Sequence, residues 1–375
     1  MKRSVTAIAT IASLALAGCG AQAGSSADQD AGELENVSIS TYPVGSGTYN
    51  EMAAVSEAMT NGDGVSVRLV PSDSGSGRLT MLTQEQVDLG RVGEEYWYAF
   101  EGDNEFAAEG WGPTDVTVVW AASAPLGIAA APGSDISEPS DLRGKRIPAV
   151  LANPSANNKM DAALALGGLT RADVEEVEIG GYSEQIDALQ NGQVDAIGFN
   201  VLGSAMEELH SQMKYEWLDL SSADETAVDR MADVAPTVSV SEIEGAAGAE
   251  DGEKVTALSY PVPLVAMADK DEEFVYNYLT SMTEQYDSFV DTLVGLESFG
   301  TDAVLHEPNV VPFHPGLVRF LEEHGKWTEE AAAKNTDLIE RGEALREEWQ
   351  KYVDQAGADI GPEDWAAWKE ENVPQ

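Results

Sequence analysis

The chain has 375 residues, enough for two ordinary domains, and 43% of them are hydrophobic, enough for a sizeable core. It carries 66 acidic against 21 basic residues, a net charge of −45 at pH 7, which argues against nucleic acid as a partner. The acidic residues are spread along the whole chain. We interpret them as an adaptation to a salty, halophilic setting rather than as calcium ligands, because no calcium-loop motif occurs.

The N-terminus has the pattern of a secretory signal. Lys2 and Arg3 precede a short apolar stretch and then the sequence LAGC at residues 16–19. This sequence resembles a bacterial lipobox, which predicts a signal peptide over 1–18, a lipidated Cys19 and a flexible tether over 19–36. The alternative is ordinary cleavage after Ala23. Cys19 is the only cysteine, so no internal disulfide can form.

Removing residues 1–18 would leave 19 basic against 66 acidic residues, a net charge of −47. Such a charge destabilises a compact chain by self-repulsion, and molar salt screens charges beyond about 3 Å. We therefore expect the melting temperature to rise between dilute buffer and molar sodium chloride. A flat or falling melting temperature would contradict this prediction.

Strands and helices alternate along the chain, which favours an α/β fold. One unit recurs: residues 78–93 and 185–200 each contain a short helix, Gln-Val-Asp and a strand, and the two copies lie 107 residues apart. This repetition predicts two similar lobes. The long apolar run over 255–268 has β character and is long enough to cross between them.

These observations predict a two-lobed fold of the periplasmic-binding-protein type with a C-terminal helical extension. The expected parts are lobe one over 37–124 plus 257–320, lobe two over 125–256, and helices over 321–375 packed on the body. Four tryptophans are expected to pin those helices: Trp327, Trp349, Trp365 and Trp368.

Three similar polar loops follow predicted strands and precede predicted helices, at residues 43–49, 72–77 and 153–158. Helix N-termini at the carboxyl ends of strands can bind a small anion without a full cation. The alternative is plain helix capping, for which the same residue types are preferred. The candidate solute-binding residues in these loops are Gly47, Thr48, Tyr49, Gly75, Ser76, Ser155, Asn157 and Asn158.

Arg91 follows a predicted strand end, where it could pair a carboxylate. Its alternative role is an ion pair with a nearby acid such as Glu94 or Glu95. Glu94 is itself a candidate solute-binding residue, and Lys159 is a weaker one.

Four motifs resemble the TAXI family of solute receptors, the binding components of TRAP transporters. They are TYPVGSGTYNEM (41–52), GSGRLTMLTQEQVDLGRVG (75–93), DLRGKRI (141–147) and PFHPGLVRFLEEHGKW (312–327). The resemblance covers about residues 38–327, and its last motif is the most specific. The chain departs from the family at Ser46, where a glycine is usual, at Arg91, and in its last 48 residues.

The resemblance implies a receptor that binds a small organic acid, a dicarboxylate or glutamate-like solute, between its lobes. It would deliver that solute to a TRAP membrane permease. We expect a monomer without cofactor or metal, held outside the cytoplasm by its lipid anchor, in the periplasm or on the outer cell surface. The alternatives are the receptor of an ABC importer and, in another class, a secreted lipoprotein enzyme.

An enzyme is not favoured because G-x-S-x-G, H-E-x-x-H and C-x-x-C are all absent, and the four histidines lack metal-site spacing. His314, within Pro-Phe-His-Pro-Gly, is interpreted as part of a structural turn before a helix.

Overall fold

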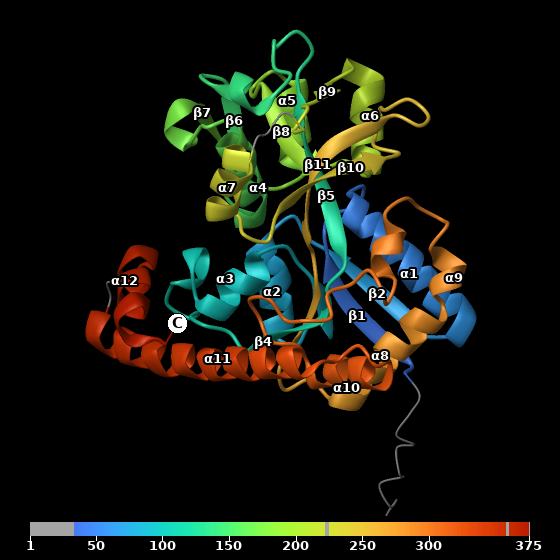
Figure 1. Cartoon of the computed structure of the whole chain (residues 1–375), viewed down its shortest axis with the longest axis vertical. Coiled ribbons are helices and arrows are strands. Elements are labelled where there is room, and N and C mark those ends of the chain that lie inside the picture. Colours follow the sequence, from blue (N-terminus) through green and yellow to red (C-terminus); the bar gives the residue numbers. More distant parts are fainter. Residues whose placement is uncertain (1–33, 222–224, 358–359, 375) are drawn as a thin grey trace, which may run out of the picture. The chain divides into compact units, whose positions relative to one another are not determined.

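The computed structural model describes residues 34–221, 225–357 and 360–374 (Figure 1). The predicted signal peptide, the lipid attachment site Cys19 and nearly all of the tether lie outside these residues. Within the described residues, no helix is both long enough and apolar enough to span a membrane.

Lobe one is built on a mixed sheet in the order β2-β1-β3-β12-β4. β1 is parallel to β2 and β3, and β12 runs antiparallel to β3 and β4. The strands are β1 (Asn36–Thr41), β2 (Ser66–Pro71), β3 (Leu89–Arg91), β4 (Val116–Trp120) and β12 (Leu264–Met267). The helices of this lobe are α1 (Gly47–Asp63), α2 (Gly75–Thr83), α3 (Glu95–Glu101), α8 (Glu272–Glu284) and α9 (Tyr286–Phe289), with 3-10 turns η1 (Asn104–Phe106) and η4 (Leu296–Phe299).

Lobe two has an antiparallel sheet in the order β10-β11-β5-β8, in which β9 also pairs with β5, and a separate parallel pair β6-β7. The strands are β5 (Ser123–Ala130), β6 (Arg146–Val150), β7 (Glu175–Ile179), β8 (Ala196–Asn200), β9 (Glu216–Trp217), β10 (Ser239–Glu244) and β11 (Lys254–Pro261). The helices are α4 (Pro154–Leu166), α5 (Glu184–Gln190), α6 (Ser204–Met213) and α7 (Glu225–Val234), with 3-10 turns η2 (Pro139–Leu142) and η3 (Arg171–Asp173).

The two aspartates of the repeated Gln-Val-Asp unit have the same role in the two lobes. Asp88, just before β3, accepts a hydrogen bond from the backbone N–H of Ser38 in β1, at 2.8 Å. Asp195, just before β8, accepts one from the N–H of Arg146 in β6, also at 2.8 Å. In each lobe a buried strand is thus tied at its start to a neighbouring strand.

The chain crosses between the lobes at two adjacent places. β4 leads to β5 through residues 121–122, and β11 leads to β12 through residues 262–263; the N–H of Val262 donates to the carbonyl of Ala122 at 2.9 Å. The predicted crossing of the 255–268 run is therefore observed. Its expected boundary at 256/257 falls inside β11, because β11 stays paired with β5 as far as Pro261.

Each lobe has its own core. The larger core joins residues 37–122 to residues 264–373, and the second consists of Tyr42 and residues 124–262. The two-lobed α/β fold with a helical extension that the sequence predicts is thus confirmed.

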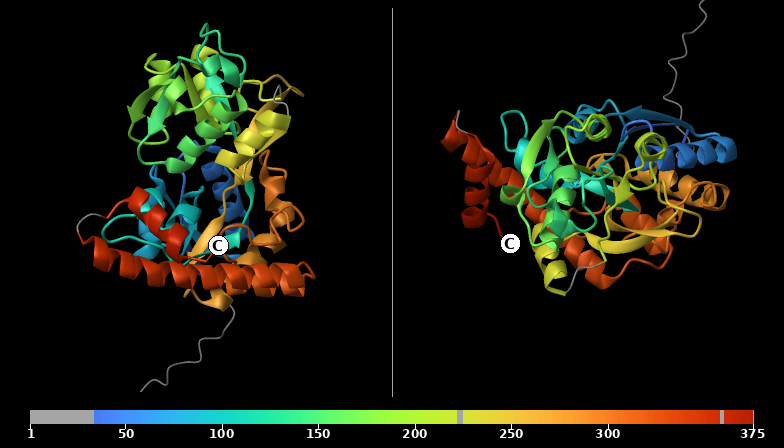
Figure 2. Two further views of the ribbon diagram at one scale, coloured as in Figure 1. Left: turned by 60° about the vertical axis from the view of Figure 1, so that its left-hand side comes forward. Right: turned by 90° about the horizontal axis from the view of Figure 1, so that it is seen from above.

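The C-terminal helices pack on lobe one rather than extending from it. They are α10 (Pro315–Glu323), α11 (Glu329–Ala356) and α12 (Pro362–Asn372), and α11 runs along lobe one on the side away from lobe two (Figure 2). Trp365 is fully buried, and its Nε1 donates to the carbonyl of Glu101 at 2.9 Å. The other three tryptophans are partly buried against the same core, which confirms their predicted structural role.

His314 caps the start of α10. Its Nδ1 accepts a hydrogen bond from the N–H of Gly316 at 3.1 Å, and its Nε2 lies 3.0 Å from the carbonyl of Lys270. This pair of contacts fits a neutral ring protonated on Nε2, and burial lowers the pKa of His314 to about 4. The structural role predicted for this histidine is confirmed.

His314 therefore predicts a pH dependence of stability. The unfolded chain takes up a proton near the ordinary pKa of 6.5, whereas the folded chain keeps the ring neutral down to about 4. The unfolded state thus binds more protons in this window, and stability should fall as the pH falls through it. His314→Asn keeps a capping oxygen without the titration. Denaturant unfolding should show that the wild type loses more stability between pH 7 and pH 5 than the variant; equal losses would contradict the assignment.

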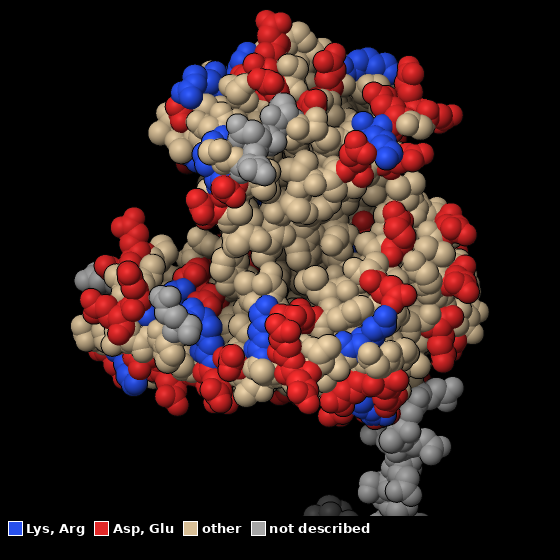
Figure 3. All heavy atoms as spheres, in the orientation of Figure 1, with Lys and Arg blue, Asp and Glu red and all other residues tan. Residues whose placement is uncertain are grey.

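On the face shown in Figure 3, acidic side chains are spread over the outer parts of both lobes, and few charged residues lie in the region where the lobes meet. On this face the charge is thus distributed and is not gathered at one patch. This arrangement fits screening by salt better than a localised cation site.

Candidate functional site

The three polar loops predicted to bind a solute all end in capped helices. Ser46 caps α1 and accepts from the N–H of Tyr49, Ser74 caps α2 and accepts from Gly77, and Asn153 caps α4 and accepts from Ala156. The capping alternative therefore holds for the residue that precedes each helix. The predicted solute-binding residues lie one or more positions later, inside the first turns.

Several of those predicted residues are engaged elsewhere. The N–H of Tyr49 is used by the Ser46 cap, and Ser76 Oγ lies 3.1 Å from Ser74 Oγ. Asn157 braces its own loop, because its amide both accepts from and donates to the backbone of Val150. The side-chain Nδ2 of Asn158 donates a hydrogen bond to the carbonyl of Val234 at the protein surface, at 3.2 Å.

Arg91 pairs with an acid of its own lobe. It is fully buried within lobe one, and its Nη2 pairs with Glu51 of α1 at 3.1 Å. Arg91 Nε and Nη1 have no hydrogen-bond partner among the described residues, so the pairing of Arg91 with a solute stays a prediction. The ion-pair alternative holds with a different partner from the two acids expected, because α1 carries Glu51 onto the same face of the sheet as Arg91.

Glu94 of lobe one reaches into lobe two. Ser155 Oγ donates to Glu94 Oε2 at 2.5 Å, Thr237 Oγ1 donates to Oε1 at 3.3 Å, and the Lys159 ammonium forms an ion pair with the same carboxylate. Ser155 and Lys159 lie one turn apart on α4. Glu94 is 2% exposed and Lys159 is 0% exposed, so this is a buried bridge between the lobes.

Beside this bridge, Arg78 and Glu95 form a second pair of opposite charges, both fully buried. Arg78 Nη2 lies 3.7 Å from Glu95 Oε1, and Arg78 Nη1 donates to the carbonyl of Ser72 at 3.0 Å. Arg78 Nε and Nη2 have no hydrogen-bond partner among the described residues, and neither oxygen of Glu95 accepts from another of them. Buried polar groups are rarely left in this condition, because each costs free energy unless it is hydrogen-bonded.

Three tyrosines surround the two ion pairs. The Arg78 guanidinium lies 3.9 Å from the centre of the Tyr42 ring, and Lys159 Nζ lies 4.1 Å from the centre of the Tyr260 ring. Tyr182 of lobe two packs edge-on against Tyr42 with ring centres 5.7 Å apart. Its hydroxyl accepts from the N–H of Asn200, whose own Nδ2 is buried without a partner.

Burial disfavours the charged forms of the ionisable side chains in this cluster. Burial raises the pKa of the Glu95 carboxyl, and the nearby Arg78 offsets part of that effect. Burial lowers the pKa of the Lys159 ammonium, and Glu94 opposes that shift. Burial also raises the pKa of Tyr42. A partner that brought complementary charge to Arg78 and Glu95 would therefore be bound strongly, because the local dielectric is low.

Hydrogen bonds from three loops of lobe one hold the two lobes together around this cluster. The N–H of Gly75 donates to the carbonyl of Ala152 at 2.9 Å, and the N–H of Ala205 donates to the carbonyl of Gly45 at 3.0 Å. Asp73 accepts from both the N–H and the hydroxyl of Ser183, at 3.0 and 2.6 Å. All three contacts join a lobe-one loop to lobe two.

Gly47 of lobe one lies against Asn200 of lobe two, and this contact gives a prediction. A Cβ on Gly47 would lie 2.4 Å from Asn200 Oδ1, which is itself held by the N–H of Leu202. Because Asn200 cannot retreat without losing that bond, Gly47→Ala should force the lobes apart. Small-angle X-ray scattering should show a larger radius of gyration for Gly47→Ala, while Gly361→Ala, which has open space around it, should match the wild type. An unchanged radius for Gly47→Ala would contradict the closed contact.

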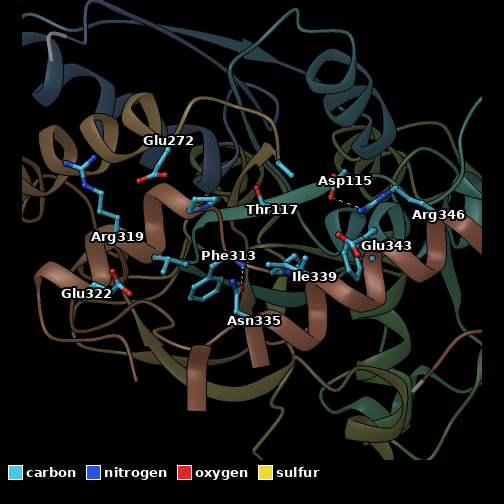
Figure 4. A pocket seen from close by; sticks show the side chains of 16 residues that line it. Asp115, Thr117, Glu272, Phe313, Arg319, Glu322, Asn335, Ile339, Glu343 and Arg346 are labelled. Atoms are coloured by element: carbon cyan, nitrogen blue, oxygen red, sulfur yellow. Dashed lines mark hydrogen bonds and ion pairs between the residues drawn. The ribbon is translucent and has the colours of Figure 1, made fainter. Parts of the chain in front are cut away.

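A cavity of about 460 Å³ lies between α11 and the body of lobe one (Figure 4). Phe313 and Ile339 are among its apolar lining residues, and Asp115 and Arg346 pair with each other at its edge, at 3.0 Å. Arg319, a third charged lining residue, pairs with Glu273 and Glu323. The packing of α11 on lobe one forms this cavity. The cluster between the lobes is the stronger candidate for a site.

Of the residues predicted from sequence, the structure brings Gly47, Gly75, Glu94 and Ser155 to this cluster, with a Cβ on Gly75 excluded by Glu95. Arg78, Glu95, Tyr42, Tyr182, Asn200 and Tyr260 were not among the predicted binding residues. One sequence feature could have indicated Arg78: it is a single charge in the otherwise uncharged segment 74–83, directly after a Gly-Ser loop.

Two lobes joined by two crossing segments, with a polar, buried cluster between them, define the architecture of a solute-binding protein. The NMT1-like family matches residues 36–325, and the chain belongs to this family. The match covers both lobes and ends before α11. It does not by itself distinguish TAXI receptors from other solute receptors, and the predicted TAXI membership stays a prediction.

Comparison with curated proteins gives no match. Among solved structures, the chain is similar to R. palustris Rpa4515 with adipate, at 15% identity over 86% of this chain and 97% of that one, with a TM-score of 0.49. It is similar to the alkanesulfonate-binding protein SsuA from Xanthomonas axonopodis pv. citri bound to MOPS, at 15% identity over 80% and 98%, TM-score 0.46. A third is the amino acid ABC transporter substrate-binding protein AbpA from Streptococcus pneumoniae bound to L-arginine, at 14% identity over 70% and 95%, TM-score 0.42. At this distance the similarities carry no information about the solute of this chain.

Proposed function

We propose that the protein is an extracytoplasmic receptor that binds a small organic acid between its lobes and delivers it to a membrane importer. One observation carries the proposal: Arg78 and Glu95 are fully buried between the lobes, and within the part of the chain that the structure describes two donors of Arg78 and both acceptors of Glu95 have no hydrogen-bond partner. A solute carboxylate suits the Arg78 fork, since planar guanidinium groups bind carboxylates with two parallel hydrogen bonds.

The place of the protein in the cell follows from its N-terminal sequence. The lipobox-like LAGC predicts attachment of the mature chain to a membrane through acyl chains on Cys19. A receptor tethered in this way would stay close to its importer. We propose a monomeric receptor rather than a secreted enzyme, because the sequence contains no G-x-S-x-G, H-E-x-x-H or C-x-x-C motif.

Two classes of importer are candidates for the partner. The four TAXI-like motifs favour a TRAP permease, whereas AbpA, one of the similar structures, is named as part of an ABC transporter. The two classes of importer differ in the energy source that drives uptake. Uptake in membrane vesicles that depends on a sodium gradient and not on ATP would assign the protein to TRAP transport, and uptake that depends on ATP would assign it to an ABC importer.

The experiment that tests the receptor function itself is native mass spectrometry of the purified protein, followed by isothermal titration calorimetry. Monocarboxylic acids, dicarboxylic acids and amino acids would be titrated into the wild type. The proposal expects one bound solute per chain, with conversion of none of them. No bound solute by mass spectrometry together with no heat from any compound would overturn it.

A further inference from the structure

Glu94 occupies a position that an incoming anion would be expected to fill. Its carboxylate lies against the first turn of α4, where it accepts from Ser155 and pairs with Lys159, and it also accepts from Thr237. Helix N-termini with a hydroxyl and an ammonium group are typical anion-binding surroundings. In this chain the anion at that position is the carboxylate of Glu94, which comes from lobe one.

The charge of the buried cluster follows from that arrangement. It holds two cations, Arg78 and Lys159, and two carboxylates, Glu94 and Glu95. Glu94 uses the charge of Lys159, because the two are in direct contact, so the guanidinium of Arg78 is the one cation of the four groups with unpartnered donors. Glu95 adds an acceptor surface beside it. A solute with one carboxylate and one ammonium group would leave the cluster neutral, whereas a second carboxylate on that solute would bring an uncompensated negative charge into a buried, neutral site.

We propose that Glu94 is a specificity-determining residue whose carboxylate takes the second anion position, so that the site accepts solutes with a single carboxylate and a neighbouring amino group and rejects dicarboxylates. This inference rests on the receptor function proposed above and narrows its solute class. The repulsive element is built into the protein, which is a common way of obtaining specificity.

The test uses pairs of solutes that differ only in the second carboxylate: L-glutamine against L-glutamate, and L-asparagine against L-aspartate. Calorimetry should show the wild type binding each amide more tightly than its acid. Glu94→Gln removes the negative charge, keeps an acceptor for Ser155 and frees Lys159. It should shift the acid-to-amide preference by about tenfold or more toward the acid, as expected when a like charge is removed from a buried site.

Two further variants separate this role from a general effect on closure. Glu57→Gln, on the exposed face of α1, should leave both affinities unchanged. Glu95→Gln should weaken both members of a pair without changing their ratio, because it removes the negative charge that faces the amino group of both solutes. A loss of closure in Glu94→Gln would also lower both affinities together, so the ratio is the decisive readout.

The outcomes distinguish the specificity proposal from the receptor function. A wild type that binds L-glutamate or L-aspartate at least as tightly as the amide, or a Glu94→Gln variant with an unchanged ratio, would overturn the role of Glu94 and leave the receptor function standing. Binding of none of the four compounds, with another solute detected by native mass spectrometry, would overturn the proposed solute class alone. Failure of the receptor function requires that no solute of any kind is bound.

Discussion

Arg78→Ala is expected to lower solute affinity by about tenfold to a hundredfold or more, because a hydrogen bond to a charged group contributes roughly 1.5–3 kcal/mol and Arg78 offers two unpartnered donors. The substitution would also leave Glu95 buried without its neighbouring cation, so a lower melting temperature is expected as well. Calorimetry with the solute bound most tightly by the wild type gives the affinity.

Arg78→Lys separates geometry from charge. It keeps the positive charge near Glu95 but loses the planar fork, so it should keep most of the stability and still lose much of the affinity. Arg68→Ala provides the matched control, because Arg68 is exposed on β2 and contacts only the carbonyl of Gln86, at 3.2 Å. An unchanged solute affinity in Arg78→Ala would mean that the solute binds at another site.

Trp365→Ala is expected to give the largest loss of stability, about 3–5 kcal/mol, which is usual for removal of a fully buried tryptophan. The ring packs edge-on against Trp349 with centres 5.0 Å apart and joins α12 to α11 and lobe one. Its loss would also leave the carbonyl of Glu101 without the indole donor. Denaturant unfolding followed by far-ultraviolet circular dichroism measures the change.

Trp368→Ala is the control for this prediction, because Trp368 lies one turn later on the same helix and is only partly buried. It should cost clearly less than Trp365→Ala. Glu101, which pairs with both Arg341 and Lys369 of the extension, gives the same helices a second attachment. Equal losses for the two tryptophans would mean that α12 is not anchored by Trp365.

Much of the fold could be predicted from the sequence because its periodicity is local. The alternation of strands and helices, the repeated Gln-Val-Asp unit and the apolar run over 255–268 each reflect which faces of the chain are buried. The repeated aspartates have matching partners, Ser38 and Arg146, in the two lobes. The position of the crossing was less predictable, since β11 and β12 form one continuous apolar run and only strand pairing divides it.

The site was harder to predict because its contacts join residues far apart in the chain. Glu94 and Ser155 were both expected near the solute, but nothing local indicated that they would bind each other across the lobes. Arg91 ends the strand β3 and Arg78 lies in the helix α2, and only packing decides what each of them contacts. α1 brings Glu51 to Arg91, and Arg78 lies near Glu95. Both arginines keep donors without a partner among the described residues, and Arg78 is the one beside the bridge that Glu94 forms with lobe two.

A crystal structure of the protein with its tightest-binding solute tests the central claim most directly. The account predicts electron density between the lobes, with a solute carboxylate within hydrogen-bond distance of Arg78 Nε and Nη2 and a donor group facing Glu95. A solute bound in the cavity beneath α11 would contradict it, and so would the absence of solute density between the lobes at a saturating solute concentration.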